Sequence, residues 1–139
     1  VGQDAGITNW YQFFQETVGG AWEDYEPGSK VTYSNFAVGY IAALVELASG
    51  QSFPDFCKEH IFDVLGMERS AWFRRDLPTE DLLEAMPVQY NETSGGFEDF
   101  DHYCFIDYAS GSLRTTAKDL SLFLAAMLNH GVPLWTKET

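Results

Sequence analysis

Basic residues are scarce in this sequence. Its 139 residues include 8 Lys and Arg against 21 Asp and Glu, so the formal net charge is −13. Such a surface repels nucleic-acid backbones and anionic lipids, and we expect neither as a partner. No apolar run reaches the roughly 18 residues that a membrane span needs, and the start lacks the basic and apolar blocks of a signal peptide. We therefore expect no membrane span.

Cysteine is scarce too, and only Cys57 and Cys104 occur. Both have aromatic neighbours, which predicts two separate buried thiols. A disulfide between them stays open if their Cα atoms lie within reach. Two Cys and three scattered His do not form a recognisable set of metal ligands, so we expect no metal site and no cofactor.

Apolar residues make up 45% of the chain, which is enough for one core in a sequence too short for two ordinary domains. We expect residues 1–139 to form a single domain, mainly α-helical. Apolar periodicity and caps predict helices over residues 9–18, 35–49, 53–65 and 79–85, and another between Thr116 and Gly131. Residues 35–49 are apolar almost all round, with Glu46 their only charge. We expect this helix to be buried on most sides and to contribute more to the core than any other.

In the last predicted helix, the expected buried face consists of Leu120, Phe123, Leu124, Met127 and Leu128. Between residues 87 and 114, aromatic residues alternate with Gly, Ser and acids. This pattern predicts a long loop or a small irregular hairpin held by its rings. Packing is the more common role of such rings, although a loop of this length is often functional.

Two polar side chains, Tyr33 and Asn35, flank the start of the helix at residues 35–49. Pro27-Gly28 predicts a turn, residues 31–33 an extended piece, and Ser34 an N-cap. The free N–H groups at a helix start favour negative charge, which suits a phenol that gives up its proton. With one residue between them, both side chains can point into one cleft if the backbone is extended. The alternative is a core tyrosine with a satisfied hydroxyl and an asparagine that helps cap the helix.

Several segments together resemble the middle third of a serine β-lactamase-related hydrolase, a family that includes class C β-lactamases, D-alanyl-D-alanine carboxypeptidases and β-lactamase-fold esterases. The segments, in the family's order, are Pro-Gly-Ser-Lys-Val-Thr-Tyr-Ser-Asn-Phe-Ala-Val-Gly-Tyr-Ile at 27–41, Ala-Ser-Gly at 48–50, Ile-Phe-Asp-Val-Leu-Gly-Met at 61–67 and Ser-Gly-Ser-Leu-Arg-Thr-Thr-Ala-Lys-Asp-Leu at 110–120. The resemblance implies the helical lobe of the β-lactamase/transpeptidase-like fold without its sheet lobe.

The resemblance also implies roles for individual residues. Tyr33 matches the family's tyrosine, which exchanges a proton with the serine nucleophile and the leaving group. Asn35 matches the asparagine that hydrogen-bonds the catalytic lysine and the substrate's amide. We expect Ser110, Gly111 and Ser112 to contact substrate. The family's nucleophilic Ser-x-x-Lys and its later Lys-Thr-Gly or His-x-Gly strand do not occur among these 139 residues.

Two hypotheses follow. In the first, the chain is a fragment of a serine hydrolase that acts through an acyl-enzyme on a β-lactam, peptide or ester, and it is inactive alone. Its partners are then the small-molecule or peptide acyl substrate and the missing sheet lobe. The compartment follows the family as periplasmic or secreted, and an uncovered apolar face favours self-association. In the second, a stand-alone, non-catalytic binding module has kept the helical lobe.

Overall fold

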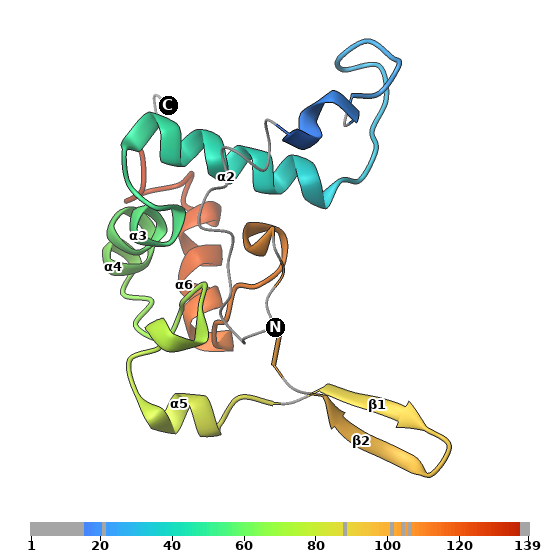
Figure 1. Ribbon diagram of the computed structural model, residues 1–139. Helices are drawn as coiled ribbons and strands as arrows, with labels where there is room; N and C mark the ends of the chain where they lie inside the picture. Colours follow the sequence, from blue (N-terminus) through green and yellow to red (C-terminus); the bar gives the residue numbers. More distant parts are fainter. Residues whose placement is uncertain are drawn as a thin grey trace.

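The computed structural model describes residues 16–20, 22–87, 89–100, 102–103, 105 and 107–136, and the helix expected at residues 9–18 lies mostly outside them. The described part is mainly helical with one two-stranded hairpin, as predicted (Figure 1). The helical elements are η1 Val18–Gly20, α2 Asn35–Ser49, α3 Phe53–Cys57, η2 Lys58–Phe62, α4 Asp63–Leu65, η3 Arg74–Asp76, α5 Glu80–Glu84, η4 Tyr108–Ser110 and α6 Ala117–Leu128. The strands β1 Gln89–Thr93 and β2 Gly96–Phe100 pair antiparallel.

Side-chain caps set the starts of the main helices. Ser34 Oγ accepts from the Ala37 N–H at 3.1 Å, and Thr116 Oγ1 accepts from the Asp119 N–H at 3.1 Å. Each bond satisfies a backbone donor that the first helical turn leaves unpaired, so the two predicted starts are confirmed. Gly50 ends α2 with φ of 72°, a left-handed conformation that glycine adopts without a steric cost.

The predicted helix over residues 53–65 is present, but its middle is wound differently. Elements α3, η2 and α4 follow one another without a break, and η2 is a π-helix of five residues. At the start of α5, Thr79 forms no side-chain cap bond.

Two small clusters form the core of the described chain. The first joins α2 to η4 through Ala42, Phe73, Tyr108 and Ala109, and the second contains Cys57, Phe62 and Met67. Phe53 and Trp72 pack against both clusters, with their ring centroids 5.2 Å apart. These two rings therefore connect α2 and η4 to the α3–α4 segment.

The expected burial of α2 is wrong. The expected buried face of α6 is wrong for three of its five residues, whereas Phe123 and Met127 are half-buried and Phe123 packs against the second core cluster. In α2 only Gly39 and Ala42 are buried, and Ile41 is 60% exposed. In α6 the buried residues are Asp119 and Ala126, whereas Leu120, Leu124 and Leu128 of the expected buried face are exposed. Apolar pattern shows which residues avoid water but not which side of a helix has a neighbour, and the described chain leaves these flanks uncovered. No single described helix is long and apolar enough to cross a membrane, although α2 together with the segment Phe53–Leu65, bent by 81° at their junction, passes by length and composition.

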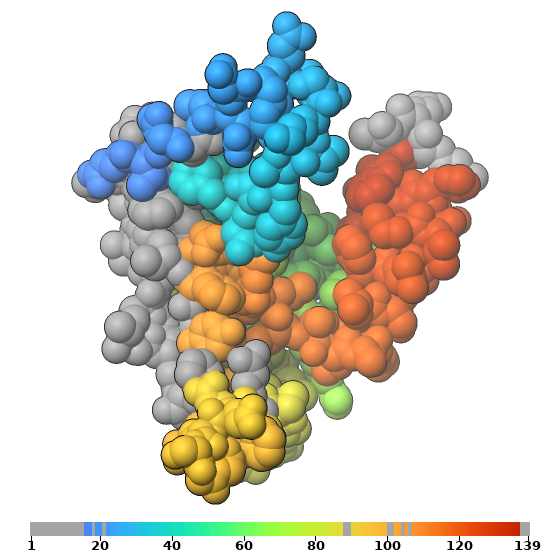
Figure 2. Space-filling view, turned by 90° about the vertical axis from the view of Figure 1, so that its right-hand side faces the viewer, coloured from blue at the N-terminus to red at the C-terminus, as the bar shows by residue number. Residues whose placement is uncertain are grey.

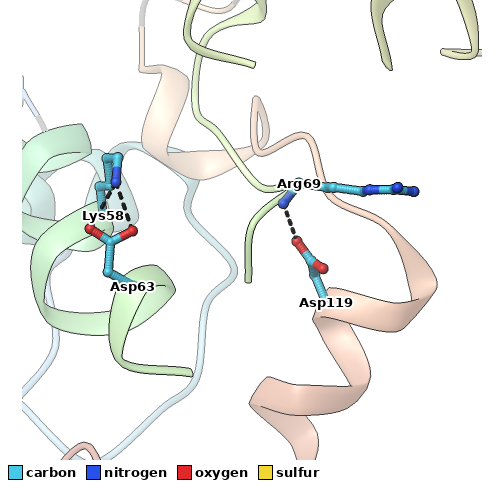
Figure 3. Close-up of polar contacts among 4 residues, drawn as sticks. All are labelled: Lys58, Asp63, Arg69 and Asp119. Atoms are coloured by element: carbon cyan, nitrogen blue, oxygen red, sulfur yellow. Dashed lines mark hydrogen bonds and ion pairs between the residues drawn. The ribbon is translucent and has the colours of Figure 1, made fainter. Parts of the chain in front are cut away.

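Asp119 attaches α6 to the segment that follows α4 (Figure 3). Its side chain, in a residue only 2% exposed, accepts from the Arg69 N–H at 2.7 Å and from Ser70 Oγ at 2.8 Å. Next to this contact, Ala71 and Arg114 exchange two backbone hydrogen bonds of 2.9 and 2.8 Å. These bonds join residues some 40 to 50 positions apart and fix where the 110–116 segment lies.

We predict that Asp119→Ala lowers the free energy of unfolding by about 1.5 to 3 kcal/mol, because a part-buried N–H and a part-buried hydroxyl lose their charged acceptor, although the Ser70 hydroxyl keeps its contact with Thr115 Oγ1. Asp63→Ala is the matched control. It removes the carboxylate that binds Lys58 Nζ at 2.7 Å on the surface, where both side chains are at least 60% exposed. An exposed ion pair contributes less than about 1 kcal/mol. Urea unfolding followed by circular dichroism measures both, and equal losses would contradict the anchoring role of Asp119.

Candidate functional site

The Tyr33 and Asn35 side chains meet at the N-terminus of α2. The Tyr33 hydroxyl donates to Asn35 Oδ1 at 2.7 Å. Ser34, between them, has the extended backbone of φ −150° and ψ 113°, so its neighbours project to the same side. Tyr33 is 86% exposed and Asn35 is also exposed. Tyr33 is therefore not a core residue, and its hydroxyl is held at the surface by a short local bond.

The opposite side of this segment lines a cavity of about 320 Å³. Thr32 and Ser34 contribute to its wall, whereas Tyr33 and Asn35 do not. The remaining lining residues are Trp22, Glu23, Tyr25, Pro27, Phe36, Ala37 and Tyr40. The Tyr25 hydroxyl donates to Thr32 Oγ1 at 2.7 Å, and this bond joins the extended segment before α2 to the preceding loop. Alternation along the backbone thus separates the polar pair from an aromatic cavity behind it.

The residues expected to contact substrate lie at η4. Ser110 Oγ donates to Asp107 Oδ2 at 2.9 Å, and the buried Ser112 Oγ accepts from the Phe105 N–H at 3.3 Å. Gly111 lies against the Phe105 ring, which a Cβ at this position would meet at 3.4 Å. Both hydroxyls therefore take part in local bonds that shape the turn.

A second cavity, of about 360 Å³, opens beside this turn. Gly111 and Ser112 line it, but Ser110 does not. The other lining residues are Met86, Pro87, His102, Tyr103, Phe105, Leu113, Arg114 and Thr115. Its lining combines polar residues such as Arg114 and His102 with apolar residues such as Phe105 and Met86.

A shared core holds the two motifs on one body. Element η4 packs on α2 through Tyr108 and Ala109. The Tyr108 hydroxyl donates to Glu46 Oε1 at 3.4 Å, and the same oxygen accepts from the Phe53 N–H at 2.7 Å. Within the described chain, no hydrogen bond joins Tyr33 or Asn35 to Ser110, Gly111 or Ser112. The structure therefore brings Tyr33 and Asn35 together, whereas Gly111 and Ser112 line a different cavity from the one behind this pair.

Sequence reasoning missed two positioning residues, Glu46 and Arg114. The signal for Glu46 was visible, because it is the only charge in an otherwise apolar helix. Arg114 donates from Nη1 to the carbonyls of Trp72 and Ser112, both at 3.0 Å, and from Nη2 to that of Tyr103 at 3.3 Å. No short sequence pattern indicates a guanidinium that binds three carbonyls.

Cys57 is a free, buried thiol, as expected, and Cys104 lies outside the described residues. Burial raises the pKa of the Cys57 thiol above its ordinary value. Its neighbours Phe62 and Met67 are apolar, so Cys57 has the environment of a core residue and not of a nucleophile. In the described residues, no three His, Cys, Asp or Glu side chains come close enough together to hold a metal ion.

The fold resembles that of solved penicillin-binding proteins and related enzymes. An octameric penicillin-binding protein homologue from Pyrococcus abyssi superposes with a TM-score of 0.70 at 24% identity, over 89% of this chain. A penicillin-binding protein from Bacillus halodurans gives 0.69 at 20% identity over 94%. The D-amino acid amidase of Ochrobactrum anthropi SV3, solved with D-phenylalanine, gives 0.62 at 20% identity over 76%. The fold is thus that of the helical part of the β-lactamase and penicillin-binding proteins.

The family model described as Beta-lactamase matches residues 3–138, so the chain belongs to the β-lactamase family of serine hydrolases. A sequence comparison with curated proteins found no match. The chain spans 28% of the Pyrococcus protein, 32% of the amidase and 40% of the Bacillus protein.

We predict that Cys57, in a Cys104→Ser background, reacts with a disulfide reagent at least about tenfold more slowly than an exposed thiol, because it is buried and its thiolate is disfavoured. Ser121→Cys on the exposed side of α6 supplies the fast control. Because the pKa is raised, the rate for Cys57 continues to increase with pH after the control has levelled off. Equal rates for the two thiols at pH 8 would contradict the core position of Cys57.

Proposed function

We propose that this chain is part of a serine hydrolase that forms an acyl-enzyme with a β-lactam, peptide or ester, and that the chain alone is inactive. Membership of the β-lactamase family supports the reaction class. The observation that carries the assignment of residues is the 2.7 Å hydrogen bond between the Tyr33 hydroxyl and Asn35 Oδ1 at an exposed helix N-terminus. A core tyrosine or a simple cap partner would not need this pair on the surface.

In this proposal Tyr33 transfers the proton. As the nucleophilic serine oxygen attacks the substrate carbonyl, Tyr33 in its phenolate form takes up the serine's proton, and the resulting phenol delivers that proton to the leaving group, which restores the phenolate. Asn35 holds the Tyr33 oxygen in place. When Tyr33 is neutral, its hydroxyl donates a hydrogen bond to Asn35 Oδ1, and when Tyr33 is ionised, the amide turns to donate a hydrogen bond from Nδ2 to the phenolate oxygen. The Ser-x-x-Lys that supplies the nucleophile does not occur in these 139 residues and comes from another part of the hydrolase.

The η4 turn contacts substrate through its surface more than through its hydroxyls. Ser110 and Ser112 already bond to Asp107 and Phe105, so they shape the turn. Gly111 and Ser112 then form part of the wall of the 360 Å³ cavity, with Arg114 beside them. A cavity of this size can hold one side chain of a substrate.

The exposed apolar flanks of α2 and α6 need a partner in the full hydrolase. The sheet lobe covers one of them in our proposal, and self-association through the other is consistent with the octameric state named for the Pyrococcus homologue. We also propose a periplasmic or secreted location, in line with the family resemblance.

The alternative is a non-catalytic binding module that uses the same surface. The observation that favours it is the lack of Ser-x-x-Lys together with two open cavities. The complete reading frame distinguishes the two hypotheses. A Ser-x-x-Lys some tens of residues upstream supports the hydrolase. A start codon and a stop codon that enclose only this stretch support the binding module.

We predict that the 139-residue chain alone is not labelled by a fluorescent penicillin or by a fluorophosphonate, because no activated serine is present. Denaturing gels with in-gel fluorescence measure the labelling, with a known penicillin-binding protein as the positive control. Stoichiometric labelling of one serine in the isolated chain would contradict the proposal.

We predict that Tyr33→Phe in the full hydrolase lowers kcat/KM by about 10² to 10⁴, the usual contribution of a positioned acid or base, because no group then transfers the proton. Tyr25→Phe is the matched control, since it removes a hydroxyl from the same loop that bonds to Thr32 on the opposite side. Initial rates with a chromogenic β-lactam or ester measure both variants. A Tyr33→Phe enzyme within twofold of the wild type would remove Tyr33 from the mechanism.

A further inference from the structure

The β1–β2 hairpin extends from the helical body in the ribbon view (Figure 1), and in the view turned by 90° its yellow atoms form the lower end of the molecule (Figure 2). Within residues 90–99, whose side chains the structure describes, none belongs to either core cluster. A two-stranded hairpin buries little apolar surface of its own and is at best marginally stable in water. Packing within the described chain therefore does not explain why the hairpin carries aromatic residues.

The strand register places two rings and two acids on one face. Tyr90 lies opposite Asp99, and Glu92 lies opposite Phe97. Because side chains two positions apart share a face, all four project to the same side, with each ring next to one carboxylate across the strands and another along its own strand. Tyr90 is 65% exposed and Phe97 73%, and both acids are exposed as well.

The two acids on this face have no partner in the described part of the chain. No hydrogen bond or ion pair engages the carboxylates of Glu92 or Asp99. Glu98, one residue before Asp99, projects to the opposite face and is exposed too. The hairpin thus combines flat apolar rings with unneutralised negative charge in a protein of net charge −13.

These features are complementary to arginine. A guanidinium stacks on an aromatic face, and its N–H groups bind a neighbouring carboxylate, so one side chain can satisfy a ring and an acid together. Arginines at alternate positions of an extended segment repeat with the same period as residues 90 and 92 or 97 and 99. A second copy of the chain is a poor occupant, because the acids of two hairpins would face one another.

We infer that this face, defined by Tyr90, Glu92, Phe97 and Asp99, binds an extended segment of a partner protein that carries arginine at alternate positions. Among the described residues no third strand pairs with the hairpin, so such a segment can also add backbone hydrogen bonds at an outer strand edge to the contacts of its side chains. The inference does not depend on the proposed roles of Tyr33 and Asn35, since neither residue takes part in it.

The test is an NMR titration of the 139-residue chain, at about 0.15 M salt where distant charges are screened. The probe is an eight-residue peptide with arginine and threonine in alternation, and the same peptide with glutamate for arginine is the negative control. We expect shifts to concentrate on the amides of residues 89–100 with the arginine peptide and to be absent with the glutamate peptide. Lysine in place of arginine should bind a few-fold more weakly.

Variants separate the face from general charge attraction. Asp99→Lys should weaken binding about fivefold, whereas Glu98→Lys, the same charge change on the opposite face, should change it less than about twofold. Tyr90→Ser with Phe97→Ser should weaken it about tenfold, since two exposed cation–π contacts are lost. The amide spectrum of each variant verifies that the hairpin is still formed. If the double variant does not form the hairpin, Asp99→Lys, which keeps both rings, still tests the inference.

Several results would overturn the inference. Equal weakening by Asp99→Lys and Glu98→Lys would show attraction to net charge only. Shifts centred on the acids of α5, or none on the hairpin up to millimolar peptide, would place the peptide elsewhere. Hairpin shifts that depend on protein concentration without peptide would identify a second copy as the occupant.

Discussion

The packing of η4 against α2 is the contact on which the other features depend. Ala42 allows Tyr108 and Ala109 to lie directly against the helix, and Glu46 binds both the Tyr108 hydroxyl and the Phe53 N–H. The apolar helix tolerates the Glu46 carboxylate at this position because its Oε1 accepts hydrogen bonds from both of these donors. Through this one contact, the helix that presents Tyr33 and Asn35 is held on the same body as the Ser110–Ser112 turn and on the Phe53 and Trp72 rings that lead to the second cluster.

Features set by neighbouring residues could be predicted from the sequence. The caps at Ser34 and Thr116 and the turn at Gly50 depend on bonds within a few residues, so the helix starts were correct. The family resemblance also rests on short motifs of neighbouring residues, and it correctly indicated the helical lobe. The bond between Tyr33 and Asn35 lies within this range as well, because Ser34 needs only an extended backbone to bring them together.

Features that depend on distant parts of the chain could not be predicted. The burial of Leu120 and Leu128 depends on what lies beside α6, and their apolar character carries no information on that. The three carbonyls around Arg114 come from segments that are up to 42 residues away. The register that places Tyr90 opposite Asp99 is set by the turn at Ser94-Gly95. The sequence therefore showed that this stretch is rich in aromatic residues, but not which of its side chains share one face of the hairpin.

The one-residue spacing in Tyr33-Ser34-Asn35 has a structural consequence beyond the pair itself. In an extended backbone, Thr32 and Ser34 must point away from Tyr33 and Asn35, and they line the aromatic cavity with Phe36 and Tyr40. Phe36 and Tyr40 also pack on the core cluster that contains Ala42. The polar pair is therefore supported from behind by side chains anchored in the core. In the proposed mechanism, Tyr33 must keep its position to within a fraction of an ångström while it transfers the proton, and this arrangement supplies that constraint at an otherwise exposed helix start.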